Sequence, residues 1–406
     1  MPLTRKANSD VHLGGTWDEK FTPVADTLLA NLETRRELGA SIYVNLDGRE
    51  VVDIWGGSKD LDGASPWAEN TLVNVASNTK NVTSLAVLML VDRGQLDVSA
   101  PVARYWPEFA ENGKQGVLVR HLLSHTAGLP VWEQPFSIED AFDIRGASAR
   151  LAAQAPWWPP GSVAGYHAST YGHLIGELVL RVTGESLGTF VQREMARPLN
   201  ADYYLGLPEA EFHRVAPITY PPMVQFGGSV RTEPTLTPVP SITERIRAGT
   251  ITRLADDVEL LLNSARWRSA ELAGSNGHTN ARGIGRIVSA LSLGGASRGI
   301  TLLSPSTIDL IFEEQARGTD LYFDVPIRWG IGYALAPNPG SAAGPLPFLQ
   351  SGGRVCYWYG QGGSFSIMDV DRRLTITYVM NLAHSTHDLV GGLYYEAVYR
   401  CLSDAR

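Results

Sequence analysis

The chain has 406 residues, of which 44% are hydrophobic and 19% are charged, a composition typical of a soluble globular protein with one large or two ordinary domains. Its net charge of −8 argues against a nucleic-acid partner, which would need a basic face. Two cysteines, Cys356 and Cys401, are too few for a disulfide framework or a thiolate metal site.

The start of the chain shows a helical pattern followed by two strands. Apolar residues recur at helical spacing over residues 18–38. Residues 41–55 predict two strands joined at Asp47-Gly48, because both turn residues tolerate the positive φ angles of a tight hairpin. No secretory signal is visible in the first ten residues, and the longest apolar run, residues 85–91, is too short to span a bilayer. We therefore expect a cytoplasmic protein with no membrane partner.

A serine and a lysine stand three residues apart where the next helix begins. A short strand is expected over residues 71–76, and a helix from about Ser77 to Arg93. Positions i and i+3 share a helix face, so the amine of Lys80 can reach the Ser77 hydroxyl if both point inward. Burial would lower the lysine pKa and let the amine remove the serine proton. The structural alternative is an N-cap serine beside a solvated lysine, which is the commoner origin of such a pair.

The middle of the chain is mostly helical in pattern. Residues 121–130, HLLSHTAGLP, predict a helix that ends at Gly128 with a buried polar turn at His125, for which a structural role is favoured over a catalytic one. Tyr166 lies between a Pro-Pro-Gly loop and a helix and is a candidate proton donor, although loop tyrosines are more often packing residues. Residues 216–240 predict a long loop. Further helical patterns cover residues 171–182, 187–199, 251–267 and 281–293.

Strand patterns return at the end of the chain, over residues 328–336, 364–370 and 374–382, before a final helix over 388–402. In residues 356–367, CYWYGQGGSFSI, three glycines in a strand context predict a close backbone approach that could present an N–H to a bound carbonyl, the alternative being a β-bulge without function.

Strands at both ends with helices between them predict an α/β (α+β) fold with one antiparallel sheet built from both termini. We expect residues 1–76 with 322–406 to form a sheet domain, residues 77–321 to form a mostly helical domain, and the active site to lie between them.

Three motifs in this order resemble those of the serine β-lactamase and penicillin-binding-protein superfamily: SNTK at 77–80, YHA at 166–168 and WYG at 358–360. The resemblance extends over residues 20–400. It implies a β-lactamase/DD-peptidase-like fold in which Ser77 is the nucleophile, Lys80 is the general base and Tyr166 protonates the leaving alkoxide. It also implies an oxyanion hole made by the backbone N–H groups of Ser77 and Gln361, and no cofactor.

Two positions depart from the family pattern. Ala168 stands where class C β-lactamases have asparagine, and Trp358 stands where the third motif begins with lysine; no lysine follows Lys114 in this chain. Both family residues serve polar recognition of an anionic amide substrate, whereas an aromatic side chain suits an uncharged acyl or alkyl group. The chain therefore looks most like the family VIII carboxylesterases, which implies hydrolysis of small uncharged esters, short-chain or aryl, through an acyl-enzyme on Ser77.

Aromatic residues near the motifs are candidates for the substrate pocket. Trp157 and Trp158 precede Tyr166, and Trp358, Tyr359 and Gly360 belong to the third motif; ordinary packing is the alternative for each aromatic.

Several other functions remain open or are disfavoured by the sequence. A β-lactamase or DD-peptidase and an acyltransferase could use the same Ser-Lys-Tyr site, and a non-enzymatic binding module is disfavoured because Ser77 and Lys80 are both present. Ser297 fits G-x-S-x-G, but the required strand before it and helix after it are missing from the pattern. His384, His387 and Asp388 lack a further ligand with metal-site spacing, so no metal is expected.

Overall fold

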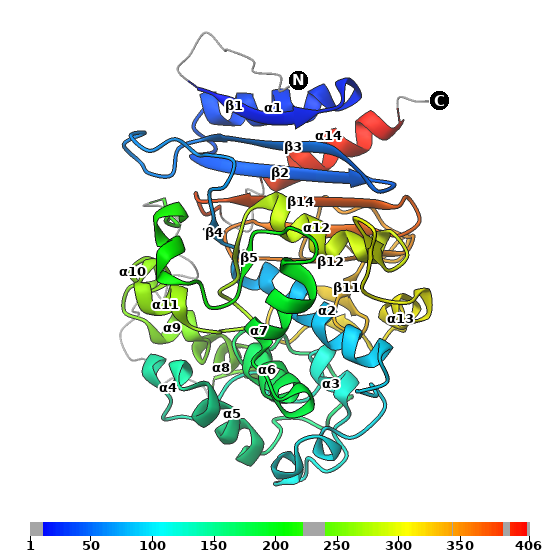
Figure 1. Cartoon of the computed structure of the whole chain (residues 1–406). Helices are drawn as coiled ribbons and strands as arrows, with labels where there is room; N and C mark the ends of the chain where they lie inside the picture. The colour runs from blue at the N-terminus through cyan, green and yellow to red at the C-terminus, as the bar shows by residue number, and fades with distance from the viewer. Residues whose placement is uncertain (1–10, 222–239, 343, 385–389, 404–406) are drawn as a thin grey trace.

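A computed structural model describes residues 11–221, 240–342, 344–384 and 390–403, and a nine-stranded antiparallel sheet dominates this part of the chain (Figure 1). Its spatial order is β1 (Leu13–Trp17), β3 (Arg49–Gly57), β2 (Gly39–Leu46), β14 (Leu374–Met380), β13 (Phe365–Asp369), β12 (Val355–Tyr359), β11 (Ala334–Leu335), β10 (Pro326–Trp329) and β9 (Ala316–Thr319). Two small sheets contain β4 (Val73–Asn74), β6 (His278–Thr279) and β5 (Tyr203–Tyr204), and β7 (Ala296–Ser297) with β8 (Ile300–Thr301).

The two ends of the chain meet at the centre of the large sheet. Strands β2 and β3 form the expected hairpin, and its turn residues Asp47 and Gly48 have φ angles of +51° and +84°. Strand β2 pairs on its other side with β14, where Ile42 faces Tyr378 and its neighbour Tyr43 faces Thr377. The prediction of one antiparallel sheet built from both termini is confirmed.

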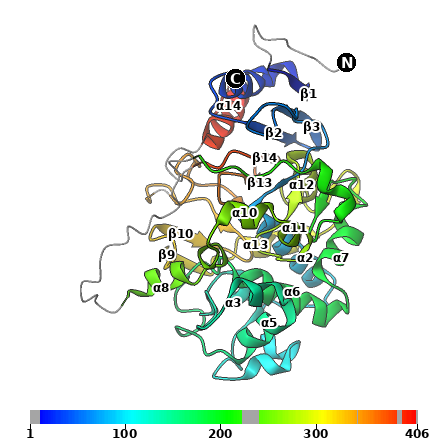
Figure 2. The ribbon, with the colours of Figure 1, turned by 90° about the vertical axis from the view of Figure 1, so that its left-hand side faces the viewer.

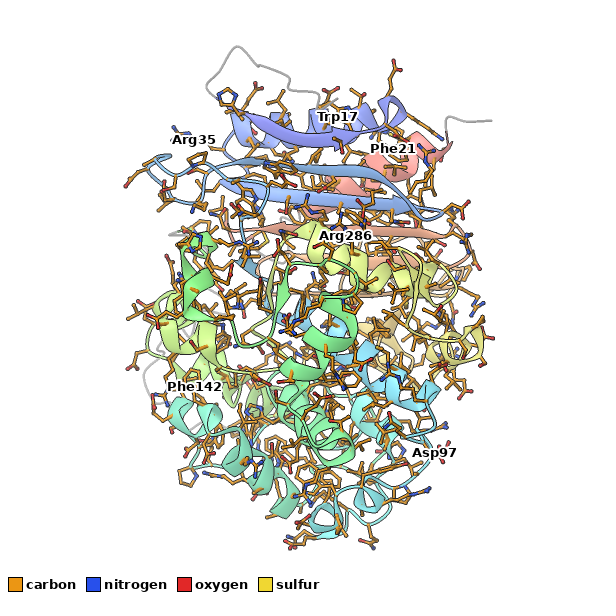
Figure 3. The ribbon with its side chains drawn as sticks, viewed as in Figure 1. Trp17, Phe21, Arg35, Asp97, Phe142 and Arg286 are labelled. Carbon is orange, nitrogen blue, oxygen red and sulfur yellow. The ribbon has the colours of Figure 1, made fainter. Side chains whose placement is uncertain are left out.

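Helices cover both faces of this sheet, so β2 is buried along most of its length. Helices α1 (Thr22–Glu33) and α14 (Gly391–Ser403) lie on one face and α12 (Ala281–Ser292) lies on the other (Figure 1). A Cβ on Gly285 of α12 would lie closer than 3.0 Å to two atoms of the Tyr43 ring, so the glycine allows close packing on the sheet. Arg286 donates to Glu50 at the start of β3 and ties α12 to the hairpin (Figure 3).

A large helical region lies below the sheet in Figure 1. Its helices are α2 (Thr79–Asp92), α3 (Val119–Leu123), α4 (Ile138–Phe142), α5 (Ile144–Ala153), α6 (Thr170–Thr183), α7 (Leu187–Val191) with a π-helical turn (Gln192–Ala196), α8 (Ile242–Ala248), α9 (Ile251–Leu254), α10 (Val258–Asn263), α11 (Ala265–Ser269) and α13 (Pro305–Ile311). Short 3-10 helices cover Glu19–Phe21, Ala76–Asn78, Val102–Arg104, Pro107–Ala110 and Glu209–Arg214.

Helix α2 is the centre of the helical core, and every side chain from Thr79 through Leu90 is buried. A second core fills the space between the large sheet, α1 and α14.

Two helix predictions were wrong in extent. Helix α3 ends at Leu123 and not at Gly128, because His125 adopts a left-handed φ of +60° that a helix cannot continue. The pattern over residues 251–267 breaks into α9, α10 and α11, since the side chains of Asp257 and Ser264 accept backbone N–H groups and start new helices.

Strand β9 belongs to the large sheet although it precedes residue 322, where we expected the sheet domain to resume. The division of the chain into two domains stays a prediction. Most of the predicted loop 216–240, together with His387 and Asp388, lies outside the described residues. Within them, no helix combines the length and apolarity that a membrane crossing needs.

Candidate active site

Ser77 sits in a short 3-10 helix that leads into α2. Ala76 before it has a left-handed φ of +44°, which is held by a hydrogen bond from its N–H to Asn74 and by one from the Thr79 hydroxyl to its carbonyl. The N-cap of α2 is Asn78, so Ser77 is not the capping residue of this helix. Ser77 is half-buried, whereas Asn78 through Lys80 are buried, so Ser77 is the most accessible residue of this four-residue motif.

Lys80 is buried and its amine faces Ser77. Its Nζ lies 3.2 Å from Ser77 Oγ and donates to the carbonyl oxygens of Ala168 at 2.9 Å and Gly274 at 2.7 Å. No carboxylate pairs with Lys80 among the described residues, and burial lowers its pKa well below the ordinary value. A neutral amine has two N–H donors and one lone pair, which match two carbonyls and the Ser77 O–H.

Tyr166 completes a cluster with these two residues. Burial raises the pKa of Tyr166 above its ordinary value, and hydrogen bonds with the Ser77 hydroxyl and with Trp358 oppose that shift. The Lys80 amine lies 4.9 Å from the centre of the Tyr166 ring. The phenol therefore stays protonated and hydrogen-bonds with Ser77, while its ring packs beside the Lys80 amine. The structure brings the predicted Ser-Lys-Tyr set together.

Trp358 reaches this cluster from β12 and is buried. Its indole N–H donates to the Tyr166 hydroxyl at 2.9 Å. Next along the chain, Gly360 lies directly against the segment before Ser77, because a Cβ on it would lie 2.5 Å from Ser364 Oγ and closer still to the Val75 carbonyl oxygen. The predicted close approach of this strand is present, and only glycine permits it.

Two backbone N–H groups remain for a bound oxygen atom. Gln361 is half-buried in the turn that follows β12, and this turn is closed by the hydrogen bond from Gly360 N–H to the Ser364 carbonyl at 2.7 Å. Among the described residues, no hydrogen-bond acceptor is found for the backbone N–H of Ser77 or of Gln361. This arrangement suits the predicted oxyanion hole.

Sequence reasoning missed the backbone and aromatic groups that surround the cluster. The carbonyls of Ala168 and Gly274 hold the Lys80 amine, and backbone acceptors carry no residue-type signal. Three aromatic rings pack around Tyr166, with ring centres 5.6 Å away for Tyr322, 5.1 Å for Phe323 and 6.1 Å for Trp329. These residues lie near the predicted domain boundary, far in sequence from the three motifs.

The predicted pocket aromatics occupy three different environments. Tyr359 is half-buried beside Trp358 and Phe323. Trp158 is buried behind the Tyr166 segment, where its ring would lie 2.6 Å from a Cβ on Gly165.

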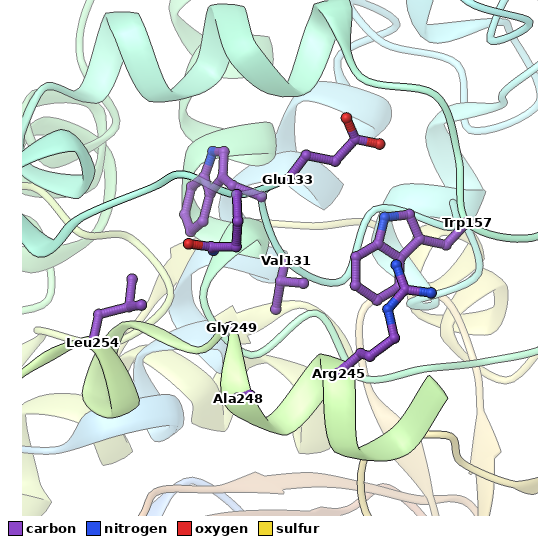
Figure 4. A pocket seen from close by; sticks show the side chains of 9 residues that line it. Val131, Glu133, Trp157, Arg245, Ala248, Gly249 and Leu254 are labelled. Atoms are coloured by element: carbon purple, nitrogen blue, oxygen red, sulfur yellow. The ribbon is translucent and has the colours of Figure 1, made fainter. Parts of the chain in front are cut away.

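Trp157 lines a cavity of about 640 Å³ together with Val131, Trp132, Glu133, Gln134, Arg245, Ala248, Gly249 and Leu254 (Figure 4). The guanidinium of Arg245 lies 4.3 Å from the Trp157 ring centre. No described contact joins Trp157 to Ser77, Lys80 or Tyr166, so its role in substrate binding stays a prediction.

The disfavoured candidates have structural roles. His125 packs against the rings of Tyr166 and Trp329, and burial lowers its pKa well below the ordinary value, as expected for a neutral residue in a polar turn. Ser297 lies in the β7–β8 hairpin and donates to the Arg286 carbonyl, so no nucleophile elbow exists there. His384 faces Glu37, and the described residues contain no cluster of three or more metal-ligating side chains.

Comparisons with known proteins agree with this geometry. A family model described as Beta-lactamase matches residues 24–399. The esterase/beta-lactamase LipL of Mycobacterium tuberculosis is 32% identical over 327 residues, which cover 80% of this chain and 75% of LipL. The crystal structure of a family VIII carboxylesterase has a TM-score of 0.83 and 34% identity, covering 96% of this chain and 99% of its own. A penicillin-binding protein homologue from Caulobacter crescentus has the same TM-score, 31% identity and the same coverage of both chains.

Proposed function

The chain belongs to the Beta-lactamase family and is a serine hydrolase of the carboxylesterase type, and we propose that it cleaves small, uncharged esters through an acyl-enzyme on Ser77. The observation that carries this proposal is the buried Lys80 amine, which lies 3.2 Å from the Ser77 hydroxyl and has no carboxylate partner among the described residues.

Acylation begins with proton transfer from Ser77 to the neutral Lys80 amine. The serine oxygen attacks the ester carbonyl and forms a tetrahedral intermediate whose negative oxygen accepts the backbone N–H groups of Ser77 and Gln361. The two carbonyls of Ala168 and Gly274 keep the Lys80 amine in place and stabilise the ammonium that forms.

Collapse of the intermediate breaks the bond to the leaving alcohol and leaves the acyl group on Ser77. Tyr166 supplies the proton that the alkoxide needs, and Lys80 returns a proton to Tyr166. A water molecule then attacks the acyl-enzyme and gives a proton to the same Lys80–Tyr166 pair. The bond from the acyl carbon to the Ser77 oxygen breaks, the pair returns the proton to that oxygen, and the acid leaves.

Trp358 supports a preference for uncharged substrates. Its indole presents a neutral N–H to the Tyr166 hydroxyl, whereas lysine at the first position of the third motif would bring a cation into the site. Without that cation, the carboxylate of a penicillin or of a peptide terminus loses its counterion and pays a desolvation cost on entering the pocket. An acyl or alkyl group packs favourably on the half-buried rings of Tyr359 and Phe323.

Hydrolysis of β-lactams is a second candidate, because the relative LipL carries both activities in its name. The same acyl-enzyme on Ser77 would serve this reaction. Transfer of the acyl group to an alcohol in place of water also uses the same site, and it differs only in which acceptor reaches the acyl-enzyme.

The test compares turnover of p-nitrophenyl butyrate and of a chromogenic cephalosporin by the wild type and by Ser77→Ala. We expect ester cleavage that vanishes in the variant and much weaker cleavage of the cephalosporin. Cephalosporin turnover equal to ester turnover would contradict the role assigned to Trp358. Addition of a primary alcohol, with analysis of products, separates hydrolysis from acyl transfer.

A further inference from the structure

Asp320 is a buried carboxylate near the cluster that has no part in the steps above. It is 1% exposed and directly follows β9. Its Oδ1 accepts the backbone N–H groups of Tyr166 at 3.2 Å, Tyr322 at 2.9 Å and Phe323 at 3.3 Å, and its Oδ2 accepts the indole N–H of Trp329 at 3.2 Å.

This carboxylate has no ion-pair partner among the described residues. Burial raises its pKa, and the four N–H donors oppose that shift because they bind the ionised form. The four N–H donors satisfy a buried group that has no cation beside it, so the hydrogen bonds join four separate backbone and side-chain groups to one carboxyl. The segments that supply these donors are therefore tied to one point.

The tied segments are the ones that enclose Tyr166. Besides the bond to Asp320, the loop after β9 donates from Leu321 N–H to the Ala164 carbonyl at 3.0 Å, so two bonds join it to the Tyr166 segment. The Trp329 ring is parallel to the Tyr166 ring within 4° and contacts Trp358 at 4.8 Å between ring centres. Trp358 in turn donates to the Tyr166 hydroxyl.

The same loop is braced from outside by α8. Arg247 donates to the Tyr322 carbonyl at 2.7 Å, and α8 lies beside β9 and β10 in Figure 2. The loop is thus fixed on one side by α8 and on the other by the Asp320 carboxylate.

We propose that Asp320 is a positioning residue, which holds the Tyr166 backbone and the rings around it so that the Tyr166 hydroxyl stays between Ser77 and Trp358. This inference rests on the proposed function, since it assigns Asp320 to the proton-donating step. Asp320 touches neither substrate nor reacting atoms, so it acts only through Tyr166.

The test uses two esters that differ in their need for a proton donor. Ethyl butyrate releases a strongly basic alkoxide, whereas p-nitrophenyl butyrate releases an anion that is stable at neutral pH. A misplaced Tyr166 slows the first reaction more than the second. Both esters form the same butyryl-enzyme, so kcat/KM, which reports the steps through acylation, is the quantity to compare. In Asp320→Ala we expect kcat/KM for ethyl butyrate to fall about 100-fold and kcat/KM for p-nitrophenyl butyrate to fall about tenfold.

Asp320→Asn is the conservative variant, because its amide oxygen can still accept the three backbone N–H groups. It should keep the wild-type ratio of the two kcat/KM values within about twofold. Asp369→Ala is the matched control, since Asp369 is a buried carboxylate that binds Arg372 and Tyr399 away from the cluster. It should lower the melting temperature and leave the ratio unchanged. If Asp320→Ala does not fold, Asp320→Leu is tested in its place, because leucine fills the same space without a hydrogen-bond acceptor.

Equal losses of activity on the two esters in Asp320→Ala would overturn the inference, and so would the same change of ratio in Asp320→Asn. In either case the proposed function still stands, provided that the wild type cleaves the esters and Ser77→Ala does not. Wild-type protein that cleaves neither ester would overturn the proposed function, and the inference would fall with it.

Discussion

Replacement of Gly360 by alanine tests whether the close approach of β12 to the Ser77 segment is needed for activity. The new Cβ would lie 2.5 Å from Ser364 Oγ and closer to the Val75 carbonyl oxygen, whereas a relaxed carbon–oxygen contact is about 3.3 Å. The Val75 carbonyl oxygen and the Gly360 Cα both belong to the backbone, so no side-chain rotation relieves this contact. The strand must therefore move by about 1 Å relative to Ser77. A shift of that size costs on the order of 100-fold in rate when it misaligns catalytic groups.

We therefore expect Gly360→Ala to lower kcat for p-nitrophenyl butyrate about 100-fold, with about 1–3 kcal/mol less stability from overpacking. Steady-state kinetics measures the first effect and urea unfolding measures the second. Gly176→Ala is the control, because Gly176 lies within α6 and a Cβ there meets no atom within 4 Å. It should keep full activity and gain about 0.5–1 kcal/mol from helix propensity. Wild-type kcat in a folded Gly360→Ala variant would refute the claim that the close approach of β12 to the Ser77 segment is needed for activity.

Three further changes test the cluster itself. Tyr166→Phe keeps the ring but removes the proton donor, so kcat/KM should fall at least about 100-fold for ethyl butyrate and less for p-nitrophenyl butyrate; equal losses would argue against proton donation. Burial lowers the pKa of Lys80, so the folded chain holds a neutral amine where the unfolded chain binds a proton. Ester turnover should therefore fall as the pH drops through the folded Lys80 pKa, and stability should rise with pH between the folded and unfolded pKa values. Lys80→Arg, which stays protonated, should lose at least about 100-fold in kcat/KM at every pH, and a wild-type pH profile in this variant would exclude Lys80 as the base. Trp358→Lys restores the family's cation and should raise cephalosporin turnover relative to ester turnover; an unchanged ratio would separate substrate choice from this position.

The sequence predicted those features that depend on local patterns. The Asp47-Gly48 turn located the β2–β3 hairpin, and the three motifs located the cluster of Ser77, Lys80 and Tyr166. The spacing of the three motifs along the chain gives no distances between their side chains. A lysine one helical turn from a serine, however, lies on the same helix face, and burial of the helix leaves its amine few other directions.

What the sequence could not predict depends on tertiary contacts. Asp320 reaches the backbone of Tyr166 across 154 positions of the chain, and nothing in its local sequence distinguishes it from a surface aspartate. The breaks between α9, α10 and α11 come from side chains that cap new helices, which compete with a continuous apolar pattern. Some aromatic residues near the motifs lie at the cluster and another lines a separate cavity. Proximity in sequence could not predict this, because it does not fix the direction of a side chain.

The central claim is a covalent acyl-enzyme on Ser77, and trapping it is the most direct test. Wild-type protein would be mixed with p-nitrophenyl butyrate, quenched in acid within the first turnover, digested and analysed by mass spectrometry. The account predicts a butyryl group on the peptide that contains Ser77, and none on that peptide in Ser77→Ala. A butyryl group on another residue, such as Ser297, or full turnover by Ser77→Ala, would contradict it.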